Sequence, residues 1–278
     1  MSLPLLTGSI AAGAAGGGGI PASIVDGENL AHWWKFDEGS TTAATDYGLS
    51  ATAGTVFTMS GVTAETAGGP TAIGSPDHVE LDGVSDVIYQ ATQTSGVRTA
   101  LGDTINNAGG ITVCYWIKAL ESWSGPGYSV YWTNATNGSW RGGAGAFITY
   151  GMHFAWEGET AGAYSNHAVN YTDTGFGSWE HHAMTFPAGG TVGTLGIYKN
   201  GVLKGSRTTT SAYTTAYGST YPGATYPIIY FGLGAQKKSG TSGYPVNYNA
   251  YMAVSDFRIY TSVLSAGDLL NITAGDWT

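Results

Sequence analysis

Two histidines, His181 and His182, stand side by side in the stretch SWEHHAMTF of a chain that has only six histidines. Histidine is the commonest metal ligand and a frequent general base, so the pair raises the question of a metal centre or a catalytic site. The stretch is typical of a strand, in which successive side chains point to opposite faces. His181 is then expected to share a face with Ala183, and His182 to share the other face with Met184. Because groups on opposite faces cannot readily chelate one ion, we expect structural roles for both histidines.

The rest of the chain shows no pattern of catalytic or metal-binding residues. It has no G-x-S-x-G elbow, no P-loop and no dinucleotide-binding fingerprint. Its one cysteine, Cys114, lies in the apolar run ITVCYWI and is expected to be buried rather than nucleophilic. No zinc signature is present, because the remaining histidines form no close-spaced set with the pair or with carboxylates: His32, His78, His153 and His167. We therefore predict no catalytic residue and no metal ligand, and expect that the protein is not an enzyme.

Aromatic residues suggest another chemistry, the stacking of sugar rings. The middle of the chain, residues 121–173, is irregular and rich in aromatic, Gly, Ser and Asn residues. Five of its aromatic residues are candidates for binding carbohydrate: Trp123, Tyr128, Trp132, Trp140 and Trp156. The alternative is that they fill the space between two sheets or cover a protein interface, where Trp and Tyr are enriched.

The composition indicates an all-β protein. Glycine makes up 44 of 278 residues, more than twice the usual share of about 7%, whereas only 10% of the residues are charged. Since 42% of the residues are hydrophobic, the chain can build a core from many short strands joined by glycine-rich turns. The formal net charge of −9 repels phosphate backbones, so nucleic acid is not an expected partner.

Strand patterns follow one another along the chain. Asn200-Gly201, inside LGIYKNGVLKGS, is the strongest short-range hairpin signal, and two short strands are expected around the turn at Asp82-Gly83. Longer runs typical of strands span residues 30–36, 110–120, 228–234 and 249–260.

The pattern changes to that of a short helix near the C-terminus, in SVLSAGDLLNI. Ser265 is expected to cap this helix, and Asp268, three residues on, can complete a capping box. Leu269, Leu270 and Ile272 are then expected to turn inward.

The order of these segments resembles that of the laminin-G-like, concanavalin-A-like jelly-roll family. The segments that carry the resemblance are LAHWWKFDEGS, VELDGVSDVIY, GITVCYWIKA, WEHHAMTF, LGIYKNGVLKGS and MAVSDFRIYTSVLSAGDLL, spread over residues 30–272. The resemblance implies an all-β, two-sheet antiparallel jelly-roll sandwich. Residues 1–29 lie outside the family's pattern, and we expect them to form an extended N-terminal arm, with one short helix near the C-terminus. The resemblance is compatible with glycan binding, whereas packing or a protein interface is the favoured role of the aromatic residues.

Some jelly rolls are glycoside hydrolases whose strand motif E-x-D-x-x-E projects carboxylates into one cleft. Glu80 and Asp82 match the first two positions, but Ser85 stands at the third. The resemblance instead explains Asp82 as part of a D-G turn, which agrees with a protein that is not an enzyme.

Calcium is an open alternative for Asp46, which stands where the family often has D-x-S-G-N-x-x-x-G. Only the Asp and the final Gly54 persist in this chain. The competing interpretation is an Asx turn at the start of a loop, so no cofactor is predicted and calcium is kept as a second possibility to test.

The N-terminal residues 1–29 are rich in Gly and Ala and are predicted to form an assembly arm, with residues 30–278 forming the jelly-roll domain. Docking on a partner would use the large apolar residues of the arm: Leu3, Leu5, Leu6, Ile10 and Ile20. No Lys or Arg precedes Lys35, and we predict neither a signal peptide nor a membrane span.

These features predict a non-enzymatic structural protein of a bacteriophage virion, made in the host cytoplasm and docked through its arm. Capsid decoration is favoured slightly over a tail or fibre component, because the chain has no heptad stalk or repeat. Its partners would be other virion proteins and further copies of itself. The alternative prediction is a lectin-like carbohydrate-binding module for host or matrix glycans.

Overall fold

The computed structural model describes most of the chain from residue 24 onward. The described ranges are 24–51, 55–74, 77–91, 109–120, 128–133, 143–147, 152–160, 163–171, 177–187, 194–208, 230–233, 236–237, 246–247 and 250–275. For strands β8 to β11, β16 and β17, and for the first three residues of β15, it describes the course of the backbone and the pairing only. The arm residues Leu3, Leu5, Leu6, Ile10 and Ile20 lie outside the described residues.

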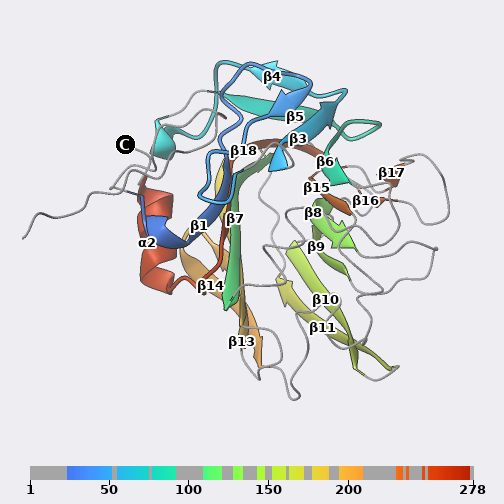
Figure 1. Ribbon diagram of the computed structural model, residues 1–278, viewed down its shortest axis with the longest axis vertical. Helices are drawn as coiled ribbons and strands as arrows, with labels where there is room; N and C mark the ends of the chain where they lie inside the picture. Colours follow the sequence, from blue (N-terminus) through green and yellow to red (C-terminus); the bar gives the residue numbers. More distant parts are fainter. Residues whose placement is uncertain are drawn as a thin grey trace, which may run out of the picture.

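The strands form two antiparallel sheets, as predicted, and Figure 1 shows them as two layers. The first, sheet A, has the order β14-β13-β12-β7-β18-β5-β4, with β1 also paired to β18. Its strands, in that order and ending with β1, are Val202–Thr208, Thr194–Lys199, Glu180–Pro187, Gly110–Ala119, Tyr251–Tyr260, His78–Asp82, Thr63–Glu65 and Leu30–Trp34.

The second sheet, sheet B, has the order β11-β10-β9-β8-β15-β6-β3-β2. Its strands are Ala163–Tyr171, Met152–Thr160, Gly143–Phe147, Tyr128–Thr133, Tyr230–Leu233, Val87–Ala91, Phe57–Ser60 and Ala43–Ala44. A separate two-stranded ribbon pairs β16 (Gln236–Lys237) with β17 (Val246–Asn247), and a short 3-10 turn, η3 (Thr71–Ile73), precedes β5.

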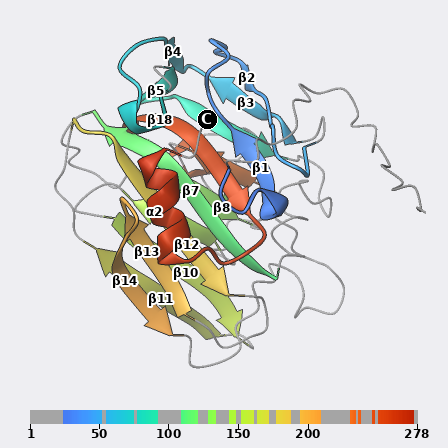
Figure 2. The same ribbon diagram turned by 90° about the vertical axis from the view of Figure 1, so that its left-hand side faces the viewer.

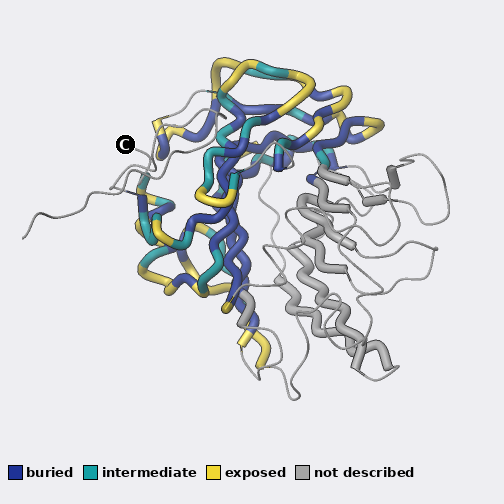
Figure 3. Tube along the Cα trace, viewed as in Figure 1, coloured by how far each residue is buried: buried dark blue, intermediate teal, exposed yellow. Residues whose placement is uncertain are grey.

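The main core lies between the two sheets. Trp34 packs its ring 4.3 Å from that of Phe57, and Tyr115 packs 5.7 Å from Phe257, so aromatic rings of both sheets meet in one cluster. Strand β7 is buried over nearly its whole length, which agrees with its near-continuous apolar sequence. Figure 3 shows β7 and β18 as the buried centre of the described chain.

A second core lies on the outer face of sheet A, under helix α2 (Ala266–Ala274) (Figures 1 and 2). The predicted capping box is confirmed: the Ser265 hydroxyl accepts from the backbone N–H of Asp268, whose carboxylate accepts from the N–H of Ser265 at 2.9 Å. Leu269 and Ile272 are fully buried. The prediction for Leu270 is wrong, since it is 53% exposed; one residue past Leu269 turns the helix by about 100°, away from the sheet.

The two turns singled out in the sequence have different roles. Asn200 and Gly201 have φ angles of 50° and 73° and close the hairpin between β13 and β14, as predicted. The turn after Asp82 instead joins β5 of sheet A to β6 of sheet B, so the strands that flank it do not pair with each other.

The described chain begins against the second core. Ile24 is buried there with Leu264, Leu269 and Ile272, and a 3-10 turn, η1 (Gly27–Asn29), leads into β1. The last residues of the predicted arm therefore pack on the domain. Among the described residues, no helix is long and apolar enough to cross a membrane.

Candidate functional site

His181 faces the second core, as its strand position predicts. Its Nδ1 lies 3.2 Å from the hydroxyl of Thr273, which itself donates to the carbonyl of Leu269 at 2.8 Å. The hydroxyl proton is thereby used, so Nδ1–H of His181 is the donor to Thr273. Burial, with smaller contributions from the charges of Arg258 and His182, lowers the pKa of His181 to about 3. His181 is therefore a neutral packing residue of the second core, not a general base working near neutral pH.

His182 lies on the opposite face, at the margin of the main core. Its ring is 6.1 Å from that of Tyr115, and its Nε2 is 3.2 Å from Glu180 Oε2. The other oxygen of Glu180 pairs with Lys199 Nζ at 2.6 Å. The two adjacent histidines thus face separate cores, which confirms that they point to opposite faces of the strand.

The two carboxylates of the hydrolase-like stretch have separate partners in the structure. Asp82 Oδ1 accepts from the backbone N–H groups of Val84 and Ser85 at 2.8 and 3.1 Å, so it holds the turn. Partial burial raises the pKa of Asp82, but hydrogen bonds from this turn outweigh it and leave the pKa below its usual value. Glu80 contacts His78 instead, at 3.3 Å.

Asp46, the residue considered as a calcium ligand, is buried and hydrogen-bonded to other groups of the protein. One oxygen lies 2.7 Å from Nδ1 of His32, and the other accepts from the backbone N–H groups of Trp33 and Gly48, both at 2.9 Å. The bond from Gly48, two residues on, is that of the predicted Asx turn. In the part of the chain that the structure describes, no group of three or more His, Cys, Asp or Glu residues could hold a metal ion.

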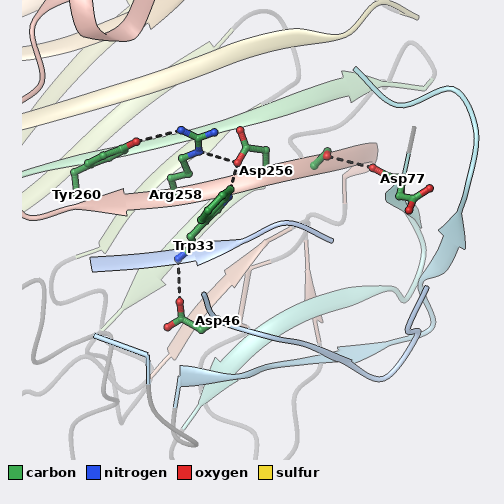
Figure 4. Close-up of polar contacts among 7 residues, drawn as sticks. Trp33, Asp46, Asp77, Asp256, Arg258 and Tyr260 are labelled. Carbon is green, nitrogen blue, oxygen red and sulfur yellow. Dashed lines mark hydrogen bonds and ion pairs between the residues drawn. The ribbon is translucent and has the colours of Figure 1, made fainter. Parts of the chain in front are cut away.

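A buried ion pair between Asp256 and Arg258, at the bulge in β18, is hydrogen-bonded to Trp33 of β1. Arg258 Nε donates to Asp256 Oδ1 at 2.8 Å, and the indole N–H of Trp33 donates to the same oxygen at 2.7 Å (Figure 4). Arg258 also stacks over the Trp33 ring at 5.2 Å and donates to the hydroxyl of Tyr260. Figure 4 shows Trp33 bonded on its two sides, by its backbone to Asp46 and by its ring to Asp256. These charged groups are structural, because each is enclosed and bonded within the fold.

The five candidate aromatic residues are divided by the structure. Trp123 and Trp140 lie outside the described residues. The other three are Tyr128 and Trp132 on β8 and Trp156 on β10.

The register of sheet B assigns faces to these strand positions. Positions 132 and 156 both pair with Ala144, and 132 is two residues from Val130, which pairs with the core residue Leu233. Paired residues and residues two apart share a face, so 132 and 156 belong to the inner face. Tyr128, beyond a bulge, pairs with Phe147 and belongs to the outer face. The sugar-binding role of the set stays a prediction.

A different aromatic residue, Trp179, stands among polar groups on the outer face of sheet A. Its indole N–H donates to the carbonyl of Gly68 at 2.6 Å, and its ring meets that of His78 edge-on at 5.2 Å. The ammonium of Lys118 lies 5.6 Å from the ring centre. Glu80, bonded to His78, is 31% exposed. We name Trp179, His78, Lys118 and Glu80 the Trp179 cluster.

The Trp179 cluster combines the groups that recognise polyhydroxylated ligands. An indole that is partly exposed supplies a flat apolar face, while a carboxylate accepts hydroxyl protons and an ammonium donates. The hydrogen bond to Gly68 and the ring of His78 fix the indole before any ligand arrives. Sequence reasoning missed this site because Gly68 is 111 positions away from Trp179 and no local pattern signals their contact.

Comparison with known proteins supports the fold. No protein-family model and no curated protein sequence matches the chain. Among solved structures, a Trypanosoma rangeli sialidase in complex with 2,3-difluorosialic acid superposes with a TM-score of 0.57 at 13% identity, covering 90% of this chain and 33% of the sialidase. The botulinum neurotoxin serotype C1 binding domain gives 0.54 at 13% identity, covering 89% of this chain and 52% of that one.

Domain 4 of AbnA, a GH43 extracellular arabinanase from Geobacillus stearothermophilus, was solved in complex with arabinotriose. It superposes with a TM-score of 0.52 at 14% identity, over 88% of this chain and 98% of that domain. Our chain therefore spans about a third to a half of the sialidase and toxin chains but nearly all of the arabinanase domain. At this identity the likeness is one of fold, and it establishes the protein as a jelly-roll β-sandwich.

Proposed function

We propose that this protein is a non-enzymatic carbohydrate-binding module and that the Trp179 cluster is its sugar-binding site. The observation that carries the proposal is the fixed, partly exposed indole of Trp179, with an ammonium over the ring and a carboxylate close by. The cluster lies on a sheet face, built from β5, β7 and the residue before β12. A rigid sheet places such groups more accurately than loops do.

The size of the stacking contribution follows from the area of one ring face. An aromatic side chain has about 150–250 Å² of surface in all, and Trp179 is partly buried, so a sugar ring on its open face would cover roughly 50 Å². At about 25 cal/mol per Å², this contact stabilises the complex by about 1.3 kcal/mol. Removing the indole should then weaken binding by roughly tenfold.

The structural neighbours support this proposal. Those that resemble the chain in fold include a domain bound to arabinotriose and a sialidase bound to a sialic acid derivative. Sugar binding therefore occurs among proteins of this fold. The proposal that this chain binds sugar depends on the Trp179 cluster.

A glycan array followed by calorimetry tests the proposal. The wild-type chain should bind at least one oligosaccharide, with arabinotriose and sialylated glycans included as probes. Trp179→Ala should remove this binding, and Glu80→Gln and Lys118→Met should each weaken it. Trp123→Ala is the matched control, since it removes one of the five aromatic residues predicted from the sequence. If Trp123→Ala abolishes binding and Trp179→Ala does not, the site lies in that aromatic set; if the wild-type chain binds no glycan, the proposal fails.

Attachment to a virion through the arm stays a prediction from the sequence, since residues 1–23 lie outside the described residues. It is compatible with sugar binding, because a surface protein of a particle could carry a glycan-binding domain. Co-sedimentation of the chain with purified particles, with and without residues 1–20, tests it directly.

A further inference from the structure

The outer face of sheet A becomes more exposed from one row of residues to the next. The pairing of β12, β7, β18 and β5 places the outward-facing residues in rows that run across the strands. One row is buried, and its members are at most 5% exposed: His78, Ser255, Trp116 and His181. In the next row Trp179, Lys118 and Glu80 are partly exposed. Beyond it Tyr251 is partly exposed and Asp82 is exposed. Along the strands, a ligand on Trp179 can therefore extend only toward Tyr251.

Tyr251 shares the face of the Trp179 cluster. It lies two residues from Ala253, which pairs with Lys118 of β7 and with Glu80 of β5, and residues two apart on a strand face the same way. Figure 2 shows β5, β18 and β7 as neighbouring strands. Neighbouring strands are about 4.8 Å apart and residues two apart on one strand about 6.7 Å, so the Cα atoms of Trp179 and Tyr251 are about 12 Å apart. One sugar ring cannot cover both side chains, whereas linked sugars can.

The groups beside the two aromatic residues form hydrogen bonds. The carboxylate of Glu80 is 31% exposed and accepts hydroxyl protons, while the ammonium of Lys118 donates. Thr63 of β4 pairs with Glu80 and is exposed, so its hydroxyl extends the same row. The row therefore offers donors and acceptors next to flat apolar faces, as sugar rings with their hydroxyl groups require.

The charges on this surface disfavour an anionic ligand. Three carboxylates belong to the described rows, those of Glu80, Asp82 and Glu65, and Lys118 is the one Lys or Arg described there. Asp82 is the direct cross-strand neighbour of Tyr251. An acidic sugar on Tyr251 would thus place its carboxylate beside that of Asp82, and like charges at such a distance repel. A neutral sugar meets no such repulsion.

We propose that the Trp179 cluster and Tyr251 together bind an uncharged oligosaccharide, with one sugar on Trp179 and a linked sugar on Tyr251. This inference rests on the proposed function and narrows its ligand class. Glu80 and Lys118 bind hydroxyl groups near Trp179, and Asp82 disfavours acidic sugars near Tyr251. A monosaccharide occupies the Trp179 cluster alone and does not contact Tyr251.

Neutral sugars of two lengths test the extent of the site, with calorimetry for the trisaccharides and NMR titration for the weaker monosaccharides. The probes are arabinose and arabinotriose, glucose and cellotriose, and N-acetylglucosamine and chitotriose. Tyr251→Ala should weaken the binding of a trisaccharide by roughly fivefold and leave its monosaccharide unchanged, whereas Trp179→Ala should weaken both. A Tyr251→Ala chain that had lost its fold would lose the monosaccharide as well.

Leu49→Ala is the matched control for the loss of an exposed side chain. Leu49 is 61% exposed and lies on the loop after β2, outside these rows. This variant should bind both lengths like the wild type.

Acidic trisaccharides test the charge selectivity. 3′-Sialyllactose and trigalacturonic acid should bind at least tenfold more weakly than the best neutral trisaccharide at low salt. Added salt should reduce this difference, because it screens the repulsion, and so should Asp82→Asn. The amide oxygen of Asn can still accept the hydrogen bonds of the turn, so the variant should keep the local structure.

The outcomes separate this inference from the proposed function. A neutral trisaccharide that Tyr251→Ala and the wild type bind equally well would overturn the inference. So would an acidic trisaccharide that binds more tightly than the neutral ones and is lost in Trp179→Ala. Both results would leave the Trp179 cluster as a sugar-binding site. A wild-type chain that binds no sugar would overturn the proposed function itself, and this inference with it.

Discussion

Acid should destabilise this protein through His181, and the size of the effect can be worked out. Burial, as the largest cause, lowers the pKa of His181 to about 3 in the folded chain, whereas an unfolded histidine has a pKa of about 6.5. Below pH 6.5 the unfolded chain therefore binds a proton that the folded chain does not. The folded state loses about 1.4 kcal/mol per pH unit from pH 6.5 downward, until the loss levels off near pH 3. At pH 4.5 the contribution of His181 amounts to a loss of about 2.7 kcal/mol relative to pH 7.5.

His181→Asn isolates this contribution. The side-chain amide of Asn can take the place of Nδ1–H and donate to Thr273, but it does not titrate. The free energy of unfolding would be measured by urea denaturation at several pH values between 7.5 and 4.5 for both proteins. Between the ends of this range the wild-type chain should lose about 2.7 kcal/mol more than the variant, whatever the stability of the variant at pH 7.5.

Thr273→Val is the control for the hydrogen bond alone. It removes the partner of His181 and should destabilise the protein by about 1 kcal/mol. It should keep the wild-type dependence on pH, because the burial of His181 persists. Equal pH dependences for wild type and His181→Asn would refute the reasoning, as would an NMR titration in which His181 protonates near pH 6.

Three further predictions follow from local contacts. Ser265→Ala removes the capping box of α2 and should lower the free energy of unfolding by about 1 kcal/mol, measured by urea denaturation with Ser50→Ala, at an exposed loop position, for comparison. Gly201→Ala places a Cβ at a φ of 73° and against Leu270, and should lower the thermal midpoint measured by calorimetry, whereas Gly205→Ala, inside β14, should lower it less. Trp33→Phe keeps the ring but removes the indole N–H that donates to Asp256, and should destabilise the fold by about 1–3 kcal/mol in chemical denaturation; a variant as stable as the wild type would show that this hydrogen bond contributes nothing.

Part of the fold could be predicted from the sequence, because it depends on contacts between residues close together in the chain. The Asn200-Gly201 hairpin, the Ser265 capping box and the Asx turn at Asp46 all involve residues within a few positions of each other, so residue types alone predict them. The opposite faces of His181 and His182 follow from the period of a strand in the same way. The jelly-roll prediction came from the resemblance of the ordered strand segments to a known family.

Features that depend on residues far apart in the sequence could be assigned only from the tertiary structure. The turn after Asp82 looks the same in sequence whether its flanking strands pair or enter different sheets, and only closure of the sandwich sends β6 into sheet B. The strand positions of Tyr128, Trp132 and Trp156 could not be assigned to faces without the register of sheet B, which a bulge between Tyr128 and Val130 shifts by one residue.

The sequence by itself determined the strand-rich composition, the turns, the helix cap and the uncharged character of residues 1–25, because each depends on residue types and on neighbours a few positions apart. Only the tertiary structure decided which surfaces could function. Trp179 meets Gly68 across 111 positions, and Trp33 meets Asp256 across 223. Such contacts form when sheets pack and the chain closes long loops, and the free energy that selects them belongs to the whole fold rather than to any short segment.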